Sequence, residues 1–302
     1  MTENELILFD RLEVIRKTIG KYGESNFYVS FSGGKDSTVL HYLIDEALPN
    51  NKIPRVYINT GIEYNDILNF VKEMNNADER IEIVNSNVHI PSMLKEKGYP
   101  FKSKEHAHKL AIYQHGGMTK AIQRYVDGLR EDNSLSRFSC PKVLRYQFSD
   151  DFDLKISDRC CEELKKKTAH RYEKKSGRNI SIIGVRMDEG GQRSHQKGCV
   201  VFDSKNNLKK FKPLNPVSDE FMDWYIKSRK IKLCRLYYEP FNFKRTGCKG
   251  CPFALDLQDQ LETMERFLPN ERKQCEILWK PVYDEYRRIG YRLDKNEQGK
   301  LF

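Results

Sequence analysis

The chain has 302 residues, enough for one large domain or for one domain with a smaller appendage. Hydrophobic residues make up 38% and charged residues 32%, a balance that excludes disorder of the whole chain. A net charge of +10 favours anionic partners, a nucleic acid or a nucleotide, although a basic surface is also typical of ordinary solvation. The N-terminus lacks the pattern of a signal peptide, and no stretch is long enough to span a membrane. We therefore expect a cytoplasmic protein without a membrane partner, in which eight cysteines are metal ligands or reactive thiols rather than disulfides.

Strand and helix patterns alternate in the first part of the chain. Helical spacing of apolar residues predicts an amphipathic helix at the N-terminus, and short apolar runs predict buried strands separated by helices. This alternation is typical of a parallel sheet with helices on its faces. The expected elements are a helix over 3–20, a strand over 26–31, a helix over 39–47, a strand over 55–59, a helix over 67–74 and a strand over 81–84.

The second part of the chain is less regular. Residues 86–160 are expected to hold helices and loops, and residues 203–210 an exposed turn. Ser218 is the expected N-cap of a helix, with acidic residues in its first turn. The other expected elements are a strand over 179–185, a helix over 218–229 and helices from 256 onward. We divide the chain into an N-terminal helix over 1–20, a nucleotide-binding domain over 21–255 with an insertion at 86–160, and a helical extension over 256–302.

The loop 32–37 joins the first strand to the next helix and has the composition of a phosphate site. Gly33 and Gly34 permit positive φ angles and a close approach of backbone amides to a ligand. The helix presents its unpaired N–H groups and the positive end of its dipole there, Lys35 adds a positive charge, and Ser32 and Ser37 add hydroxyl donors. These groups form an anion nest, and the loop is not a Walker loop because Gly-x-x-x-x-Gly-Lys is absent.

The same loop reads Ser-Gly-Gly-Lys-Asp-Ser and resembles the PP-loop of the ATP-pyrophosphatase superfamily, Ser-Gly-Gly-x-Asp-Ser, without a departure. The resemblance implies an adenine nucleotide alpha-hydrolase-like core, a Rossmann-like α/β/α sandwich around a parallel sheet. It also implies that the loop holds the pyrophosphate of ATP, or the sulfate or phosphate of a related adenine nucleotide. We expect Lys35, Asp36 and Ser37 to act in catalysis, with Asp36 holding Mg²⁺ through water. The expected nucleotide-binding residues are Ser30, Ser32, Gly33, Gly34, Lys35, Asp36, Ser37, Asn59, Thr60, Gly61, Gly184, Arg186 and Arg193.

Further motifs in a fixed order favour one branch of this superfamily. They are Asn59-Thr60-Gly61, Gly184-Val185-Arg186 with Arg193-Ser194, Pro213-Leu214, Trp224-Tyr225, Leu236-Tyr237 and Gly247-Cys248-x-x-Cys251-Pro252. Over residues 26–255 this order resembles the phosphoadenosine-phosphosulfate (PAPS) reductase family, including its iron–sulfur adenylyl-sulfate reductases and the DNA-phosphorothioation protein DndC. The resemblance implies that Arg186 and Arg193 contact phosphate or sulfate, for which a guanidinium is suited. The alternative is that both arginines form surface salt bridges.

Two cysteine pairs form the second candidate site. Cys248 and Cys251 make a Cys-x-x-Cys motif, which alone fits zinc, redox chemistry or half of an iron–sulfur site. With Cys160 and Cys161 far upstream, it resembles the pattern of the iron–sulfur adenylyl-sulfate reductases, and this implies a [4Fe–4S] cluster on the four thiolates. The lysines that follow the upstream pair would offset the negative charge of the cluster. A tetrahedral zinc or free buried cysteines are the alternatives, and Cys140 is an alternative ligand because adjacent cysteines crowd a cluster.

One departure concerns the reductase reaction. True sulfonucleotide reductases carry a C-terminal Glu-Cys-Gly-x-His, whose thiolate attacks the sulfate sulfur, and this chain lacks it. Cys275, on an expected helix, is the only cysteine after the Cys-x-x-Cys motif. The seven histidines show no metal-binding spacing, and His106 and His108 are expected to be solvated in a charged segment.

Three functions follow. In the first, an acceptor oxygen attacks the α-phosphate of ATP, the loop and Mg²⁺ stabilise the leaving pyrophosphate, and the activated acceptor takes sulfur. The acceptor would be DNA or tRNA, and the sulfur donor a protein such as a cysteine desulfurase. The second is reduction of adenylyl sulfate or PAPS, with Cys275 or an external thiol as nucleophile. The third is a non-catalytic nucleotide-sensing subunit, which would bind ATP without turnover.

Overall fold

The computed structural model describes residues 2–189 and 198–295. The chain forms two compact units, each made of two separate stretches of sequence. Unit 1 comprises Met1–Ser86 and Lys167–Gly247, and unit 2 comprises Asn87–Lys166 and Cys248–Phe302. The units are defined by contacts rather than by sequence order, so the division into 1–20, 21–255 and 256–302 stays a prediction. No helix in the described ranges is long and apolar enough to cross a membrane.

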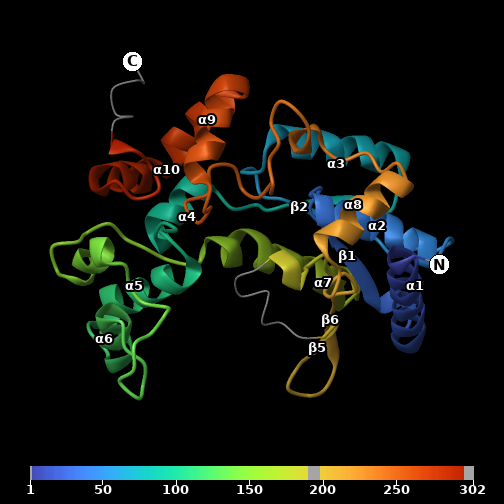
Figure 1. The fold of residues 1–302 in the computed structure, drawn as a ribbon, viewed down its shortest axis with the longest axis horizontal. Coiled ribbons are helices and arrows are strands. Elements are labelled where there is room, and N and C mark those ends of the chain that lie inside the picture. Colours follow the sequence, from blue (N-terminus) through green and yellow to red (C-terminus); the bar gives the residue numbers. More distant parts are fainter. Residues whose placement is uncertain (1, 190–197, 296–302) are drawn as a thin grey trace. The chain divides into compact units, whose positions relative to one another are not determined.

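Unit 1 is built on a six-stranded sheet with the strand order β3-β2-β1-β4-β6-β5 (Figure 1). Every neighbouring pair is parallel except β5 and β6, so the expected parallel sheet is confirmed with an antiparallel edge. The edge strand β5 was not predicted because all three of its side chains are exposed, and no buried pattern marks it. The strands are β1 (Phe27–Phe31), β2 (Arg55–Asn59), β3 (Ile81–Asn85), β4 (Ile180–Ile182), β5 (Val200–Phe202) and β6 (Leu208–Phe211).

Helices cover both faces of this sheet, as the alternation of side chains along β1 demonstrates. Phe27 and Val29 belong to the main buried cluster, which also contains apolar residues of α1, α2 and α8. Tyr28 points to the other face and packs on Tyr172 of α7, with ring centroids 5.4 Å apart. Successive strand residues face opposite ways, so the expected α/β/α layers are present. The helices are α1 (Glu3–Tyr22), α2 (Lys35–Ala47), α3 (Asn65–Ala77), α7 (Lys167–Ser176) and α8 (Asp219–Ser228).

Unit 2 is mainly helical, as expected for the insertion and the C-terminal extension. Its elements are α4 (Ile90–Lys97), α5 (Lys104–Gly116), α6 (Lys120–Asp127), a 3₁₀ segment (Lys142–Phe148), a π-helical turn (Glu162–Lys166), α9 (Leu257–Phe267) and α10 (Pro269–Ile289). The prediction that His106 is solvated was wrong, whereas His108 is exposed. His106 is fully buried, with Nδ1 3.0 Å from Tyr125 Oη and Nε2 2.8 Å from Gln147 Oε1. Burial lowers the pKa of His106 to about 4, so its ring is neutral at pH 7.

A buried charge network joins α2 to the start of β2. Arg55 is fully buried, and its guanidinium donates to Asp45 Oδ1 at 2.6 Å and to His41 Nδ1 at 3.2 Å. Arg80 donates to both oxygens of Asp45, at 2.8 and 2.9 Å. The ligand atoms of His41, Asp45 and Asp78 lie within 4.8 Å of one another, a spacing that could hold a metal ion. Because two guanidinium groups already neutralise the carboxylates, we interpret this network as structural.

Removal of the Asp45 carboxylate tests this interpretation. Asp45→Ala leaves the Arg55 guanidinium buried without its anion, and we expect a loss of about 3–5 kcal/mol in the free energy of unfolding. Glu79→Ala is the matched control, because Glu79 is an exposed acidic residue that directly precedes Arg80 of the network. Urea unfolding followed by circular dichroism measures both variants. Equal stability of the two variants would show that the network contributes little.

Candidate functional site

The predicted nucleotide-binding residues gather at the carboxyl edge of the unit 1 sheet. The loop 32–37 follows β1, Asn59 ends β2, and Gly184 follows β4. The strands β2 and β4 flank β1, so the chain changes direction in the sheet at β1. Ligands of open α/β sheets bind at such a switch point, outside the carboxyl ends of the strands.

The loop is held by its own residues and by the neighbouring helix. Gly33 has a φ of +69°, and a Cβ atom there would lie 2.8 Å from a methyl group of Val71 on α3. Ser37 Oγ accepts the Ser32 N–H at 3.1 Å and donates to the Gly34 carbonyl at 3.0 Å, while the hydroxyl oxygens of Ser32 and Ser37 are 2.9 Å apart. Both serines therefore preorganise the nest as well as lining it.

Arg186 is buried and ties the loop to α8. Its Nε donates to Asp36 Oδ1 at 3.0 Å and its Nη2 to Asp219 Oδ1 at 2.7 Å, with only 3% of the residue exposed. Burial lowers the pKa of Arg186, but the two carboxylates outweigh it and the pKa lies above its ordinary value. Arg186 therefore forms salt bridges, but these are buried and are not the surface salt bridges of the alternative. Arg186 positions Asp36, and contact with a phosphate group stays a prediction.

Gly184 explains how β4 approaches the loop so closely. A Cβ atom at Gly184 would lie 3.0 Å from both the carbonyl carbon and the oxygen of Asp36. Only a glycine allows this approach without moving the first turn of α2. Arg186, two residues later, then reaches Asp36 from the same segment.

Two carboxylates beside Lys35 were missed by the sequence analysis as site residues. Lys35 Nζ lies 3.8 Å from one oxygen of Asp219 and 3.8 Å from one oxygen of Asp223, both on α8. The hydrogen bond from Arg186 lowers the pKa of Asp219, so this group is ionised at pH 7. Asp219 was recognised only as a first-turn acidic residue, since spacing along the chain does not indicate which lysine it meets. With Asp36, these carboxylates are oxygen groups of the kind that could hold Mg²⁺ beside a bound phosphate.

Two hydroxyl groups over the loop were missed as well. The Lys35 N–H donates to Tyr237 Oη at 3.0 Å, and Tyr237 Oη lies 2.6 Å from Thr246 Oγ1. A Cβ atom at Gly34 would lie 3.1 Å from Tyr237 Oη, so the hydroxyl takes up space beside the nest. Tyr237 belongs to the motif that suggested the family, but its contact with a loop 202 residues earlier cannot be read from sequence.

The end of β2 adds a polar rim. The hydroxyl and backbone N–H of Thr60 both donate to the carboxylate of Glu63, at 2.8 and 3.0 Å, and Asn59 Nδ2 donates to Asn85 Oδ1 at 2.9 Å. Ser30 is exposed on β1, on the sheet face shared with Tyr28. Arg193 lies outside the described residues.

The four predicted metal-ligand cysteines come together in unit 2. Burial raises the pKa of Cys160, and the thiolates of Cys248, Cys161 and Cys251 raise it further. Burial and then Cys248 raise the pKa of Cys251 to about 12. Lys165 lowers both pKa values, as expected of a cation beside the group. Neighbouring thiols that cannot ionise together are stabilised as thiolates by a bound metal centre.

The spacing of these sulfur atoms bears on whether they could hold a zinc ion or a [4Fe–4S] cluster. In the described ranges, three such ligand atoms within 4.8 Å of one another occur only at the Arg55 network, so no three of the four thiols are that close. A tetrahedral zinc site with Zn–S bonds of about 2.3 Å requires sulfurs roughly 3.8 Å apart. In a [4Fe–4S] cluster each thiolate binds a different iron at its own corner, so the sulfurs stand further apart.

The Cys-x-x-Cys segment is clamped by one face of α10. Trp279 Nε1 donates to the carbonyl of Lys249 at 3.2 Å, Tyr283 Oη to the carbonyl of Gly250, and Tyr286 Oη to the carbonyl of Pro252 at 2.8 Å. The three donors recur at helical spacing and share one face. Side chains of α10 therefore hold three carbonyl groups of the cysteine turn in place.

Comparison with known proteins identifies the family. The family model described as "Phosphoadenosine phosphosulfate reductase domain" matches residues 26–147 and 143–254 of the chain. The chain belongs to the phosphoadenosine phosphosulfate reductase domain family. The expected family is therefore confirmed, whereas no curated protein matches the sequence.

Solved structures resemble this PAPS reductase-family chain only weakly. PAPS reductase from Candida auris, in a phosphate complex, is 16% identical over 79% of this chain and 87% of its own, with a TM-score of 0.46. The U34-tRNA thiolase NcsA from Methanococcus maripaludis, with its [4Fe-4S] cluster, is 16% identical over 95% and 80%, with a TM-score of 0.38. FMN adenylyltransferase from Candida glabrata is 14% identical over 82% and 62%, with a TM-score of 0.49. These likenesses are too weak to transfer a substrate or a cofactor.

Cys275 is a poor nucleophile for a PAPS reductase-family reaction. It is 1% exposed, and burial raises its pKa to about 12. It packs beneath the cysteine turn, because a Cβ atom at Gly250 would lie 2.7 Å from its Sγ. Cys140, the alternative ligand, is also buried. Burial raises its pKa to about 11, although Lys102 and Arg145 act in the opposite direction. In the family chain, Cys275 therefore supports the cysteine turn.

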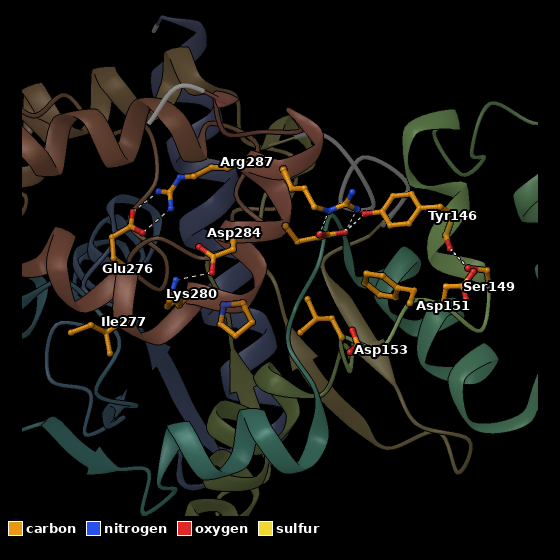
Figure 2. A pocket seen from close by; sticks show the side chains of 14 residues that line it. Tyr146, Ser149, Asp151, Asp153, Glu276, Ile277, Lys280, Asp284 and Arg287 are labelled. Carbon is orange, nitrogen blue, oxygen red and sulfur yellow. Dashed lines mark hydrogen bonds and ion pairs between the residues drawn. The ribbon is translucent and has the colours of Figure 1, made fainter. Parts of the chain in front are cut away.

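A cavity of about 1240 Å³ in unit 2 involves neither site (Figure 2). It lies between α10 and the segment 146–154. Its charged side chains are largely paired with one another, as with Glu276 and Arg287 at 2.6 Å and Lys280 and Asp284 at 2.8 Å. No residue of the phosphate loop and none of the four cysteines lines it, so we assign it no part in the chemistry.

A pair of glycine substitutions tests the cysteine turn of this family member. Gly250 has a φ of +58°, and a Cβ atom there would lie 2.5 Å from Tyr283 Oη. Gly250→Ala should cost more than the roughly 1–2 kcal/mol of a left-handed residue and should greatly reduce bound iron or zinc. At Gly247 a Cβ atom would meet nothing within 4 Å, so Gly247→Ala is the matched control. Thermal unfolding and metal analysis measure both, and equal metal content would contradict the assignment.

Proposed function

We propose that this chain is a nucleotide-dependent sulfur-transfer enzyme. It binds ATP with Mg²⁺ at the loop 32–37, releases pyrophosphate, and holds a [4Fe–4S] cluster on Cys160, Cys161, Cys248 and Cys251. The observation that carries the proposal is a phosphate nest in a PAPS reductase-family chain that also gathers four thiols, of which Cys160 is buried and the other three are partly buried. The burial of Cys275, the cysteine that follows the Cys-x-x-Cys motif, favours sulfur transfer over sulfonucleotide reduction.

The nucleotide step follows from the charges around the loop. Backbone N–H groups of the first turn of α2 and the Lys35 ammonium would bind the β- and γ-phosphates. An acceptor oxygen attacks the α-phosphorus, the bond to the bridging oxygen breaks, and its electron pair leaves with pyrophosphate. The same donors then stabilise the added negative charge. Arg186 holds Asp36 in place, and the Asp36 carboxylate would hold Mg²⁺ through water.

The thiolate site would act on the sulfur side of the reaction. When bound, a [4Fe–4S] cluster supplies a centre that can bind or transfer sulfur, or that simply fixes the fold. The chain contributes four thiolates, the Lys165 ammonium that offsets their charge, and the clamp from α10. A sulfur donor such as a cysteine desulfurase would complete the reaction.

Metal analysis and nucleotide turnover on one anaerobic sample test this function. We expect about four irons per chain, matching acid-labile sulfide, and Mg²⁺-dependent pyrophosphate release from ATP in the presence of the acceptor. Lys35→Ala should lower pyrophosphate release at least about a hundredfold while iron is retained. Cys248→Ser should lose iron, whereas Cys140→Ser should retain it. Zinc without iron would overturn the cluster, and a cluster without ATP turnover would indicate sulfonucleotide reduction or nucleotide sensing.

The exposed face of α7 supports a nucleic acid as the acceptor. Arg171, Lys174 and Lys175 are exposed, and their spacing of three and four residues places them on one side of the helix. None of the three forms an ion pair within the described part of the chain. A row of unneutralised cations on a chain with a net charge of +10 fits the phosphate backbone of DNA or tRNA.

Charge removal on α7 tests the acceptor. The triple variant Arg171→Gln, Lys174→Gln and Lys175→Gln should weaken binding of labelled tRNA or duplex DNA and reduce the slope of log affinity against log salt by about 2–3. The control changes the same total charge on exposed lysines elsewhere in unit 1, as Lys17→Gln, Lys21→Gln and Lys52→Gln. Fluorescence anisotropy measures binding of both variants. A salt slope that falls equally in both would argue against a specific role of α7.

A further inference from the structure

The hydroxyl of Tyr237 stands where a phosphate oxygen would bind. The Lys35 N–H lies in the first turn of α2, where backbone N–H groups have no acceptor within the helix and form the anion nest. Here this donor already has an acceptor, Tyr237 Oη at 3.0 Å. A bound phosphate oxygen that accepts from Lys35 must therefore replace the tyrosine hydroxyl.

The frame around Tyr237 is anchored to the loop that it covers. Tyr237 ends a 3₁₀ turn, Arg235–Tyr237, and Arg235 donates to both carboxylate oxygens of Asp66 on α3, at 2.6 and 3.1 Å. The same helix packs against Gly33 through Val71. Because α3 contacts both the loop and the turn that carries Tyr237, the hydroxyl is held over the nest.

The second partner of Tyr237 leads to the cysteine turn. Tyr237 Oη lies 2.6 Å from Thr246 Oγ1, and since the tyrosine oxygen accepts from Lys35, its own proton can be donated to Thr246. Thr246 precedes Cys248 by two residues. A Cβ atom at the intervening Gly247 would meet nothing within 4 Å, so no side chain of another segment packs against that side of its backbone.

We propose that Tyr237 and Thr246 are positioning residues that transmit occupancy of the phosphate loop to the Cys248-x-x-Cys251 segment. When phosphate takes over the Lys35 N–H, the Tyr237 hydroxyl turns its proton to a phosphate oxygen and releases Thr246. The backbone before Cys248 then relaxes, and the surroundings of the metal-ligand thiol change. This inference rests on the proposed function and adds to it a link from the nucleotide to the thiolate site.

Hydrogen exchange with and without ATP tests the link without requiring turnover. In the wild-type protein, saturating ATP and Mg²⁺ should change exchange of the backbone amides in residues 244–251, and should shift the visible spectrum of the iron-loaded protein. In Tyr237→Phe, which keeps the partly buried ring, and in Thr246→Val, both changes should be lost. Calorimetry should still detect ATP binding, with a dissociation constant within about tenfold of wild type, the effect of one hydrogen bond.

Tyr238→Phe is the matched control. Its hydroxyl accepts the Leu233 N–H at 3.1 Å and serves the same 3₁₀ segment. This variant should keep the wild-type response to ATP. If ATP binds but both test variants respond as the wild type does, or if wild type shows no response in residues 244–251, the link is wrong while ATP binding stands. If calorimetry detects no ATP binding by the wild type, the proposed function fails and the link fails with it.

Discussion

The buried guanidinium of Arg186 is the interaction on which the nucleotide site depends. A buried cation is unfavourable unless anions surround it, and Arg186 draws its anions from two helices, Asp36 on α2 and Asp219 on α8. The segment after β4 can make these contacts only because Gly184 lets it approach the backbone of Asp36. One charge therefore fixes the first turn of α2, the start of α8 and the end of β4 around the loop.

This arrangement sets the electrostatic character of the loop. Lys35, the positive end of α2 and Arg186 face the carboxylates of Asp36, Asp219 and Asp223 at short range. The carboxylates keep the cations in place, and under the proposed function their oxygen atoms would hold the divalent cation that accompanies a polyphosphate. In the proposed reaction, a nest preorganised in this way would need little rearrangement as charge develops on the leaving pyrophosphate.

The thiolate site of unit 2 is organised by different means. Its shape comes from neutral hydrogen bonds, because aromatic donors of α10 hold the carbonyl groups around Cys251. Cys275 fills the space under Gly250 and is not one of the four proposed ligand cysteines. The chain thus contains two candidate sites of contrasting chemistry, a phosphate nest in unit 1 and a group of four thiols in unit 2. The link through Tyr237 and Thr246 would let the first site influence the second.

The sequence by itself determined the features that neighbouring residues encode. The phosphate loop, the first three strands, the N-cap Ser218 and the two cysteine pairs depend on adjacent residues or on a short period, so they can be read without a structure. The contacts that complete the site join residues 150 to 202 positions apart, such as Asp36 with Arg186 and Lys35 with Tyr237. Only the tertiary structure decided these partners, and it also decided the burial of His106, which lies among charged neighbours in sequence but packs against Tyr125 and Gln147 in space. The physical reason is that side-chain contacts and burial follow from how distant segments pack, and one-dimensional spacing does not contain that information.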